Sequence, residues 1–154
     1  MGSEMCIRDS NKGGEYRKWY GNQDYVINWE NNGQELYDFK PKSVIRNPQF
    51  YFQSSVSWSN VSSGTPSFRY YPEGFIFSHV GDCLFPKDEL DRDKLIAICN
   101  ASVTGQLLAA MAPTLHFEVG QVAKLPIANL LPGNWNLKID NLIQNAKDLS
   151  LIHI

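Results

Sequence analysis

The sequence predicts an α+β fold in which a mixed or antiparallel sheet packs against helices within a single domain. Three observations lead to this prediction. Residues 24–85 are rich in β-branched and aromatic side chains separated by polar turns. Residues 86–148 instead carry apolar side chains at helical spacing. The length of 154 residues fits one domain, and a hydrophobic content of 43% is ordinary for a chain that buries a core.

The first half contains five short segments whose composition is typical of strands: residues 25–29, 49–52, 55–58, 68–71 and 75–78. Asn31-Asn32-Gly33 marks a turn after the first of them. Pro72-Glu73-Gly74 predicts a short hairpin connection between the last two. The large aromatic side chains expected in the core are Trp29, Trp58, Phe75 and Phe77.

The second half predicts helices. Asp88 and Glu89 place negative charge where a helix N-terminus favours it, so a helix is expected from this point to residue 99. A break at residues 100–102 separates it from a second helix that Pro113 ends. That second helix is expected to bury Val103, Leu107 and Met111. After it, residues 117–119 and 125–127 are expected to be extended, and residues 136–148 to form an amphipathic helix through Leu137, Ile139, Leu142, Ile143 and Ala146.

Residues 12–22, KGGEYRKWYGN, combine cations, aromatic rings and three glycines in one short stretch. Glycine lets a backbone approach a ligand closely, cations bind phosphates or base edges, and aromatic rings stack on bases. This composition favours a loop that contacts nucleic acid, although a surface turn with its aromatics packed inward has the same composition. The candidate DNA-binding residues of the whole chain are Lys12, Arg17, Lys18, Trp19, Tyr20, Asn22, Ser57, Ser59, Ser62, Ser63 and Arg69.

Five blocks of the sequence, taken in order, resemble one family. They are residues 12–22, 25–33, 56–63, 68–77 and 113–127, the last containing F-E-V-G-Q-V-A-K-L-P-I. Their order and spacing resemble the C-terminal target-recognition region of large bacterial DNA adenine methyltransferases. The likeness is greatest to the BREX phage-defence (PglX-type) methyltransferases and their type IIG restriction-modification relatives.

The resemblance implies a function in site-specific adenine-N6 methylation for phage defence or restriction-modification. Double-stranded DNA is then the expected partner, and the parent enzyme is expected to use S-adenosylmethionine. This stretch alone is expected to be inactive, with neither catalytic nor cofactor-binding residues. An alternative is a protein-interaction module that docks other subunits of a defence system. Whether the parent also carries a nuclease depends on sequence outside these residues.

The two ends of the chain have a common explanation. Residues 5–10, MCIRDS, can be encoded by ATGTGTATAAGAGACAG and one further base. The reverse complement, CTGTCTCTTATACACAT, encodes residues 149–153, LSLIH, and then Ile or Met. A sequencing-library transposon adapter translated at both ends accounts for this pattern. We therefore expect artefact tails at 1–10 and 149–154 around a target-recognition fragment at 11–148.

Composition and motifs limit other functions. The formal net charge of −2 excludes a domain that binds nucleic acid through bulk charge, although residues 12–71 hold seven Lys or Arg against five Asp or Glu. No apolar run approaches the ~18 residues of a membrane span, and the few cysteines fit a reducing cytoplasm. The spacing of His79, Cys83, Cys99 and His116 fits no standard zinc pattern. Asn47-Pro48-Gln49-Phe50 is similar to the Asn-Pro-Pro-Phe motif of amino-methyltransferases, but a turn leading into a strand is the better interpretation.

Overall fold

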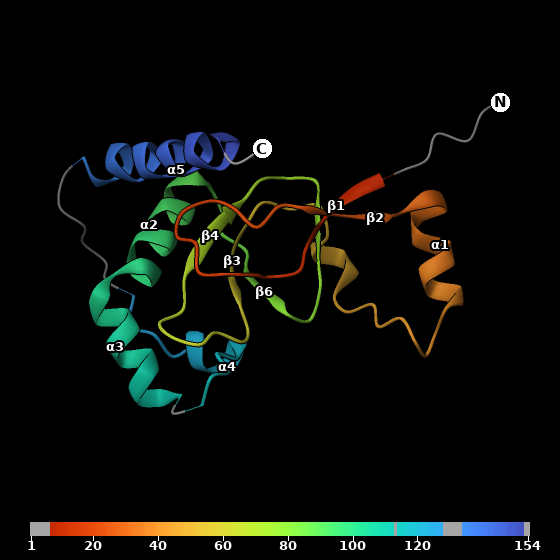
Figure 1. The fold of residues 1–154 in the computed structure, drawn as a ribbon, viewed down its shortest axis with the longest axis horizontal. Coiled ribbons are helices and arrows are strands. Elements are labelled where there is room, and N and C mark those ends of the chain that lie inside the picture. Colours follow the sequence, from red (N-terminus) through yellow and green to blue (C-terminus); the bar gives the residue numbers. More distant parts are fainter. Residues whose placement is uncertain (1–6, 113, 128–133, 153–154) are drawn as a thin grey trace.

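The computed structural model describes residues 7–112, 114–127 and 134–152. Over these residues it confirms a mixed α+β fold, with two three-stranded sheets at the centre and helices at both ends (Figure 1). The strands are β1 (Ile7–Asn11), β2 (Tyr25–Asn28), β3 (Ser55–Ser59), β4 (Phe68–Tyr71), β5 (Phe75–Phe77) and β6 (Gly81–Leu84). The helices are α1 (Glu30–Asp38), the 3-10 turn η1 (Pro48–Phe50), α2 (Glu89–Asn100), α3 (Ser102–Met111), α4 (Val119–Val122) and α5 (Trp135–Ile152).

The two sheets differ in direction. One has the order β2-β1-β5, with β1 antiparallel to β2 and parallel to β5. The other has the order β4-β3-β6 and is antiparallel throughout, with Ser57 opposite Arg69 on one side and Cys83 on the other. β3 is therefore the central strand of the second sheet.

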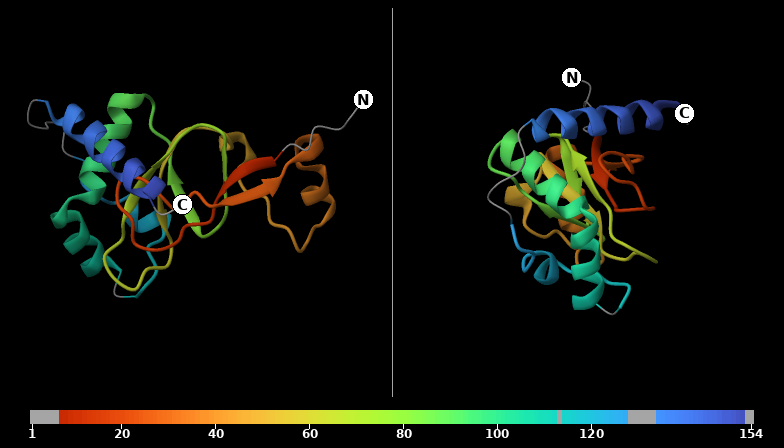
Figure 2. Two further views of the ribbon diagram at one scale, coloured as in Figure 1. Left: turned by 45° about the horizontal axis from the view of Figure 1, so that its top comes forward. Right: turned by 90° about the vertical axis from the view of Figure 1, so that its left-hand side faces the viewer.

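The main core lies between the second sheet and the helices α2, α3 and α5, which gather at one end of the molecule (Figure 2). Trp58 is fully buried there, and its indole Nε1 donates to the carbonyl oxygen of Phe117 at 2.7 Å. Burying so large a ring with its one polar atom paired is a strong stabilising contribution. The other buried members are Val56, Phe68, Ile96, Cys99, Leu108, Ala112, Phe117, Val122, Leu125, Ile139 and Ile143.

A smaller apolar cluster stabilises the opposite end, where α1 leaves the first sheet. Trp29, Tyr51 and Ile76 are buried there, and the ring centroids of Trp29 and Tyr51 lie 5.5 Å apart in an edge-to-face arrangement. The predicted core positions of Trp29, Trp58 and Phe75 are confirmed, while Phe77 is half-buried.

Several predicted elements are confirmed. The strands near residues 25–29, 55–58, 68–71 and 75–78 form, and α2 begins where the acidic residues predict it. Asp88 is the N-cap, and its side chain accepts a hydrogen bond from the backbone N–H of Asp91 at 2.8 Å. The break between α2 and α3 falls at Ala101. Asn31, Asn32 and Gly33 all have positive φ, which agrees with the predicted turn even though they lie within the bounds of α1.

Other predictions are wrong. Residues 48–50 form η1 rather than a strand, since Pro48 fixes φ near a helical value and donates no backbone hydrogen bond. The strands flanking residues 72–74 pair with β3 and β1 instead of with each other, so they form no hairpin. In α3 the buried side chains include Thr104 and Leu108, whereas those of Val103, Leu107 and Met111 are exposed. Val119, expected at the end of an extended piece over residues 117–119, instead begins the short helix α4, and Pro113 lies outside the described residues.

The expected artefact tails contribute to two elements. Residues 7–10 make up most of β1, and residues 149–152 continue α5. Their apolar side chains Ile7, Leu149 and Leu151 are all exposed. The division of the chain at residues 11 and 148 remains a prediction.

Within the described residues, no single helix has the length and apolar composition that a membrane span requires. The pair α2 and α3 meets the requirement only when both are taken together, across a bend of 66°.

Candidate nucleic-acid interface

The loop of residues 12–22 connects β1 to β2 and is fastened to the outer edge of β4. The backbone N–H of Trp19 donates to the carbonyl of Phe68 at 2.9 Å, and the N–H of Tyr70 donates to the carbonyl of Trp19 at 2.8 Å. Trp19 has a positive φ of 74° and packs partly buried against the main core. The aromatic side chain therefore anchors the loop instead of projecting from it.

Two glycines allow the loop to pack closely, one against neighbouring segments and one against the loop's own end. Gly13 has a φ of +69°, and a Cβ there would sit 2.7 Å from the carbonyl oxygen of Val80. Gly14 has a φ of +134°, and a Cβ there would sit 2.9 Å from the side chain of Asn22. Any other residue at these positions would strain the backbone and clash.

Arg69, which is fully buried, binds the loop from the interior of the protein. Arg69 of β4 donates from its guanidinium to Ser59 Oγ at 3.0 Å, to Ser67 Oγ at 3.3 Å and to the carbonyl of Glu15 at 3.4 Å. Ser59 Oγ in turn donates to the carbonyl of Gly14 at 2.8 Å. Within the described residues no carboxylate lies in ion-pair range of Arg69, and burial lowers its pKa. The guanidinium group of Arg69 is therefore bound by three neutral oxygen atoms. One belongs to the loop (the carbonyl of Glu15), and the other two hold it directly, because Ser59 Oγ binds Gly14 and Ser67 Oγ accepts from the backbone N–H of Arg17.

A second set of bonds fixes the end of the loop. The side chain of Asn22 donates to the carbonyl of Glu15 at 2.9 Å, and the hydroxyl of Tyr71 donates to the carbonyl of Asn22 at 2.7 Å. Burial raises the pKa of Tyr71 to about 12, so the phenol stays protonated as a donor at neutral pH. Asn22 itself has a φ of 57°, a conformation that asparagine tolerates better than most residues.

Beside the loop, two tyrosines and two cations form what we term the tyrosine–cation cluster: Tyr20, Tyr70, Arg92 and Lys147. The Nζ atom of Lys147 lies 5.3 Å from the ring centroid of Tyr20 and 5.9 Å from that of Tyr70, while the guanidinium of Arg92 lies 4.7 Å from Tyr70. Arg92 also pairs with Asp93 at 2.6 Å and with Asp140 at 3.2 Å. The positive charge of Arg92 is thus partly neutralised, whereas no ion pair to Lys147 occurs among the described residues.

The structure sorts the candidate residues by accessibility. Lys12 and Ser63 are exposed, Arg17, Lys18, Trp19, Tyr20, Ser59 and Ser62 are half-buried, and Asn22, Ser57 and Arg69 are buried. Ser57 Oγ accepts from Asn11 at 2.6 Å and donates to the carbonyl of Asp82 at 2.7 Å, so its bonds are internal.

Not all the candidates lie together. Arg17, Asn22, Ser59 and Arg69 meet around the loop. Lys18 donates to the carbonyl of Asn100 at 2.9 Å, at the C-terminal end of α2, where a cation is electrostatically favoured. Ser62 lies against a different segment, since its N–H donates to the carbonyl of Leu115 at 3.0 Å.

Sequence reasoning missed the most accessible aromatic ring of the loop. Tyr16 is 59% exposed, while Trp19 and Tyr20 pack against the core. Tyr16 was already part of the KGGEYRKWYGN stretch, but the sequence does not show which of its three rings faces the core. Lys147 was missed for a different reason: it reaches the loop from α5, far away along the chain, and the local sequence does not reveal this contact.

The described part of the chain holds no group of three or more His, Cys, Asp or Glu side chains that could bind a metal. Burial raises the pKa of Cys83 to about 11 and that of Cys99 to about 12, so both are protonated thiols at neutral pH.

Comparison with known proteins shows which proteins the chain is similar to. No protein-family model matches it. The chain is nevertheless homologous to a short region of the adenine-specific methyltransferases of BREX systems.

Two relatives show this. The chain is 38% identical over 141 residues to adenine-specific methyltransferase BrxX of Escherichia coli O9:H4 (strain HS), covering 90% of the chain and 11% of the relative. It is 40% identical over 124 residues to adenine-specific methyltransferase PglX of Lacticaseibacillus casei (strain Zhang), covering 77% of the chain and 10% of the relative. The chain therefore spans about a tenth of the length of the relatives it matches.

Proposed function

We propose that this chain is part of the DNA target-recognition region of an S-adenosylmethionine-dependent adenine-N6 methyltransferase that acts in phage defence. The observation that carries the proposal is its homology, at 38% and 40% identity, to two proteins named adenine-specific methyltransferases. The chain matches only about a tenth of each, so methyl transfer and cofactor binding are assigned to other parts of the parent.

The exposed side of the loop supplies the chemistry for DNA contact. Lys12 and Arg17 are cations without an ion-pair partner among the described residues. Tyr16, which lies between them in the sequence, has an exposed aromatic ring. We assign the cations to phosphate or base-edge contacts and Tyr16 to stacking or wedging. Lys147 extends the positive surface onto α5.

The buried candidates then serve to shape the loop. Arg69, Asn22 and Ser59 bind the loop's carbonyl groups from within, so the loop needs little further ordering when it meets DNA. A preorganised loop loses less conformational entropy on binding than a flexible one. Of the serines, the exposed Ser63 is the one we assign to direct contact with DNA.

Charge reversal in the full-length parent tests the proposal. Lys12→Glu together with Arg17→Glu should weaken binding to duplex DNA by about tenfold or more, because two phosphate attractions become repulsions. Binding of S-adenosylmethionine should be unchanged. The matched control is Lys40→Glu with Lys42→Glu, which changes charge equally on the exposed segment after α1.

The same variants address the competing function. A protein-interaction module predicts that DNA affinity survives the charge reversal, while capture of other defence-system subunits in a pull-down is lost. That combination would overturn the proposal.

A further inference from the structure

The outer face of α3 carries a row of exposed apolar side chains. Val103, Leu107 and Met111 are spaced four residues apart, so they lie on one face of the helix, and we term them the α3 stripe. Val103 is 59% exposed, and Leu107 and Met111 are each 37% exposed. The opposite face packs inward through Thr104 and Leu108. In Figure 1, α3 lies at the edge of the molecule, so the stripe is open to another surface.

The sequence around the α3 stripe carries no charge. Residues 95–117 contain no Asp, Glu, Lys or Arg, although these four types make up 19% of the chain. A surface helix normally places charged and polar side chains on the face turned to solvent. The polar side chains on the exposed side of α3 are those of Ser102 and Gln106, and both are neutral. Exposed apolar patches mark contact sites, and charged residues are depleted at the centre of an interface, so this composition indicates a docking surface.

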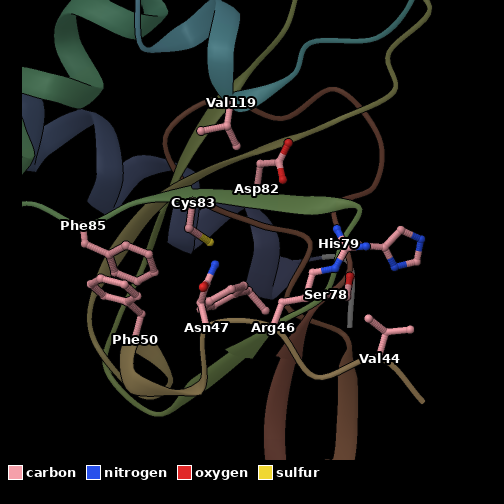
Figure 3. Close-up of a pocket in the computed structure, with 11 residues that line it drawn as sticks. Val44, Arg46, Asn47, Phe50, Ser78, His79, Asp82, Cys83, Phe85 and Val119 are labelled. Carbon is pink, nitrogen blue, oxygen red and sulfur yellow. The ribbon is translucent and has the colours of Figure 1, made fainter. Parts of the chain in front are cut away.

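Two further exposed apolar side chains continue this pattern along the chain to α4, which contacts α3. Leu115 is 56% exposed, and Val119, the first residue of α4, is 50% exposed. Val119 also lines a cavity of about 290 Å³ together with the charged side chains of Arg46 and Asp82 (Figure 3). At Val119 the apolar side chains therefore meet charged ones, as they do at the polar rim of an interface.

The homology indicates what covers the stripe. The chain spans about a tenth of the length of the relatives it matches, so a parent of that length has about nine-tenths of its residues outside this structure. Segments of one polypeptide meet at a high effective concentration, and permanent interfaces are more hydrophobic than transient ones. A membrane surface fits less well, because helices that lie on membranes carry Lys or Arg beside their apolar face and α3 carries neither.

We propose that the α3 stripe docks onto an uncharged, apolar surface formed by the rest of the parent polypeptide. The side chains of Leu107 and Met111 insert between apolar side chains of that surface, as the apolar face of a helix does in a hydrophobic groove. The flexible side chain of Met111 adapts to the shape of the groove. The inference rests on the part of the proposed function that makes this chain one region of a larger parent, and it does not depend on DNA recognition.

Docking at α3 also positions the loop of residues 12–22. Asn100 is the last residue of α2 and precedes α3 by one residue. Its carbonyl accepts from Lys18 Nζ of the loop at 2.9 Å. Its side chain accepts from the backbone N–H of Phe68 at 3.0 Å and donates to the carbonyl of Phe68 at 2.8 Å. A surface that holds α3 therefore holds β4 and the loop in a fixed position relative to the rest of the enzyme.

Cysteine labelling tests the proposal in this chain and in the full-length parent. Val103→Cys places a thiol on the stripe, and mass spectrometry of the labelled peptide follows its reaction with a maleimide apart from the native cysteines. A covered thiol reacts only when the interface opens, so the rate should be at least about tenfold slower in the parent than in this chain. Val26→Cys is the matched control, because Val26 lies on β2, is 63% exposed and is also a valine; its rate should be the same in both proteins.

A second substitution and a dilution series identify the occupant. Leu107→Glu buries a charge in the interface, so in the parent it should restore fast labelling of Val103→Cys, while the circular dichroism spectrum of this chain stays unchanged because Leu107 is exposed. Protection of Val103→Cys that is independent of protein concentration supports docking within one polypeptide. The proposal is overturned if Val103→Cys reacts equally fast in both proteins, if Leu107→Glu leaves it protected, or if dilution removes the protection, which would identify a second copy as the occupant. None of these results bears on DNA recognition, which the variants of Lys12 and Arg17 test separately.

Discussion

Neutralising two cations of the loop, Lys12 and Arg17, should change how DNA affinity depends on salt. Each phosphate contact releases condensed counterions, so log Kobs falls against log[salt] by about 0.9 for each neutralised phosphate. Lys12 is exposed, Arg17 is half-buried, and neither has an ion-pair partner among the described residues, which gives two such contacts. Lys12→Ala with Arg17→Ala should therefore make the slope shallower by about 1.8.

This slope has a measurable consequence. Between 50 and 200 mM salt, a fourfold change, the unaltered protein should lose about 12-fold more affinity than the double variant. Fluorescence anisotropy with a labelled duplex of mixed sequence measures the DNA affinity of both proteins at each salt concentration. Lys40→Ala with Lys42→Ala removes the same charge elsewhere and should leave the slope unaltered. An unchanged slope in the loop variant would refute the assignment of these cations to phosphates.

Three further results are expected. Arg69→Met removes the bonds that hold the loop, so trypsin cleavage after Lys12 and Arg17 should accelerate about tenfold, as expected for losing about 1.4 kcal/mol of hydrogen bonding; unaltered cleavage in a time course would contradict this. Gly13→Ala places a Cβ against Val80 at positive φ and should lower the free energy of unfolding in urea by about 1–3 kcal/mol; no loss would mean that the loop backbone relaxes freely. Burial raises the pKa of Cys99 from 9.0 to about 12, so its contribution to stability is present below pH 9 and lost as the pH rises toward 12. Between pH 9 and pH 11 the free energy of unfolding should therefore fall by about 2–3 kcal/mol less in Cys99→Ala than in the unaltered chain, as measured by urea unfolding at each pH. If the free energy of unfolding falls equally with pH in both proteins, burial does not keep this thiol protonated.

Local signals in the sequence were sufficient where local physics determines structure. The acidic N-terminus of α2, the strands of β-branched and aromatic residues and the left-handed turn at residues 31–33 follow from capping, side-chain shape and backbone conformation. The sequence did not reveal which strands pair. β4 and β5 are neighbours in the chain but join different sheets, a choice made by long-range packing.

The candidate site was likewise predicted in part from local sequence, while the rest depended on long-range packing. The loop of residues 12–22 was recognisable from its glycines and cations, yet the roles of its aromatics depend on which face meets the core. Trp19 turns inward because its backbone pairs with β4, and this leaves Tyr16 as the exposed ring. Arg69 was a candidate for DNA contact, but β4 directs it beneath the loop, where it binds carbonyl and hydroxyl oxygens. The face a strand residue occupies depends on register, which the sequence alone does not determine.

The most direct measurement concerns which sequence is methylated. Residues 11–148 should be exchanged for the homologous region of the Escherichia coli relative, and genomic adenine methylation mapped in cells that lack other adenine methyltransferases. If these residues read DNA, the chimera methylates a different sequence motif from the parent enzyme while using the same catalytic domain. Methylation that persists at the parent's own motif would contradict the account.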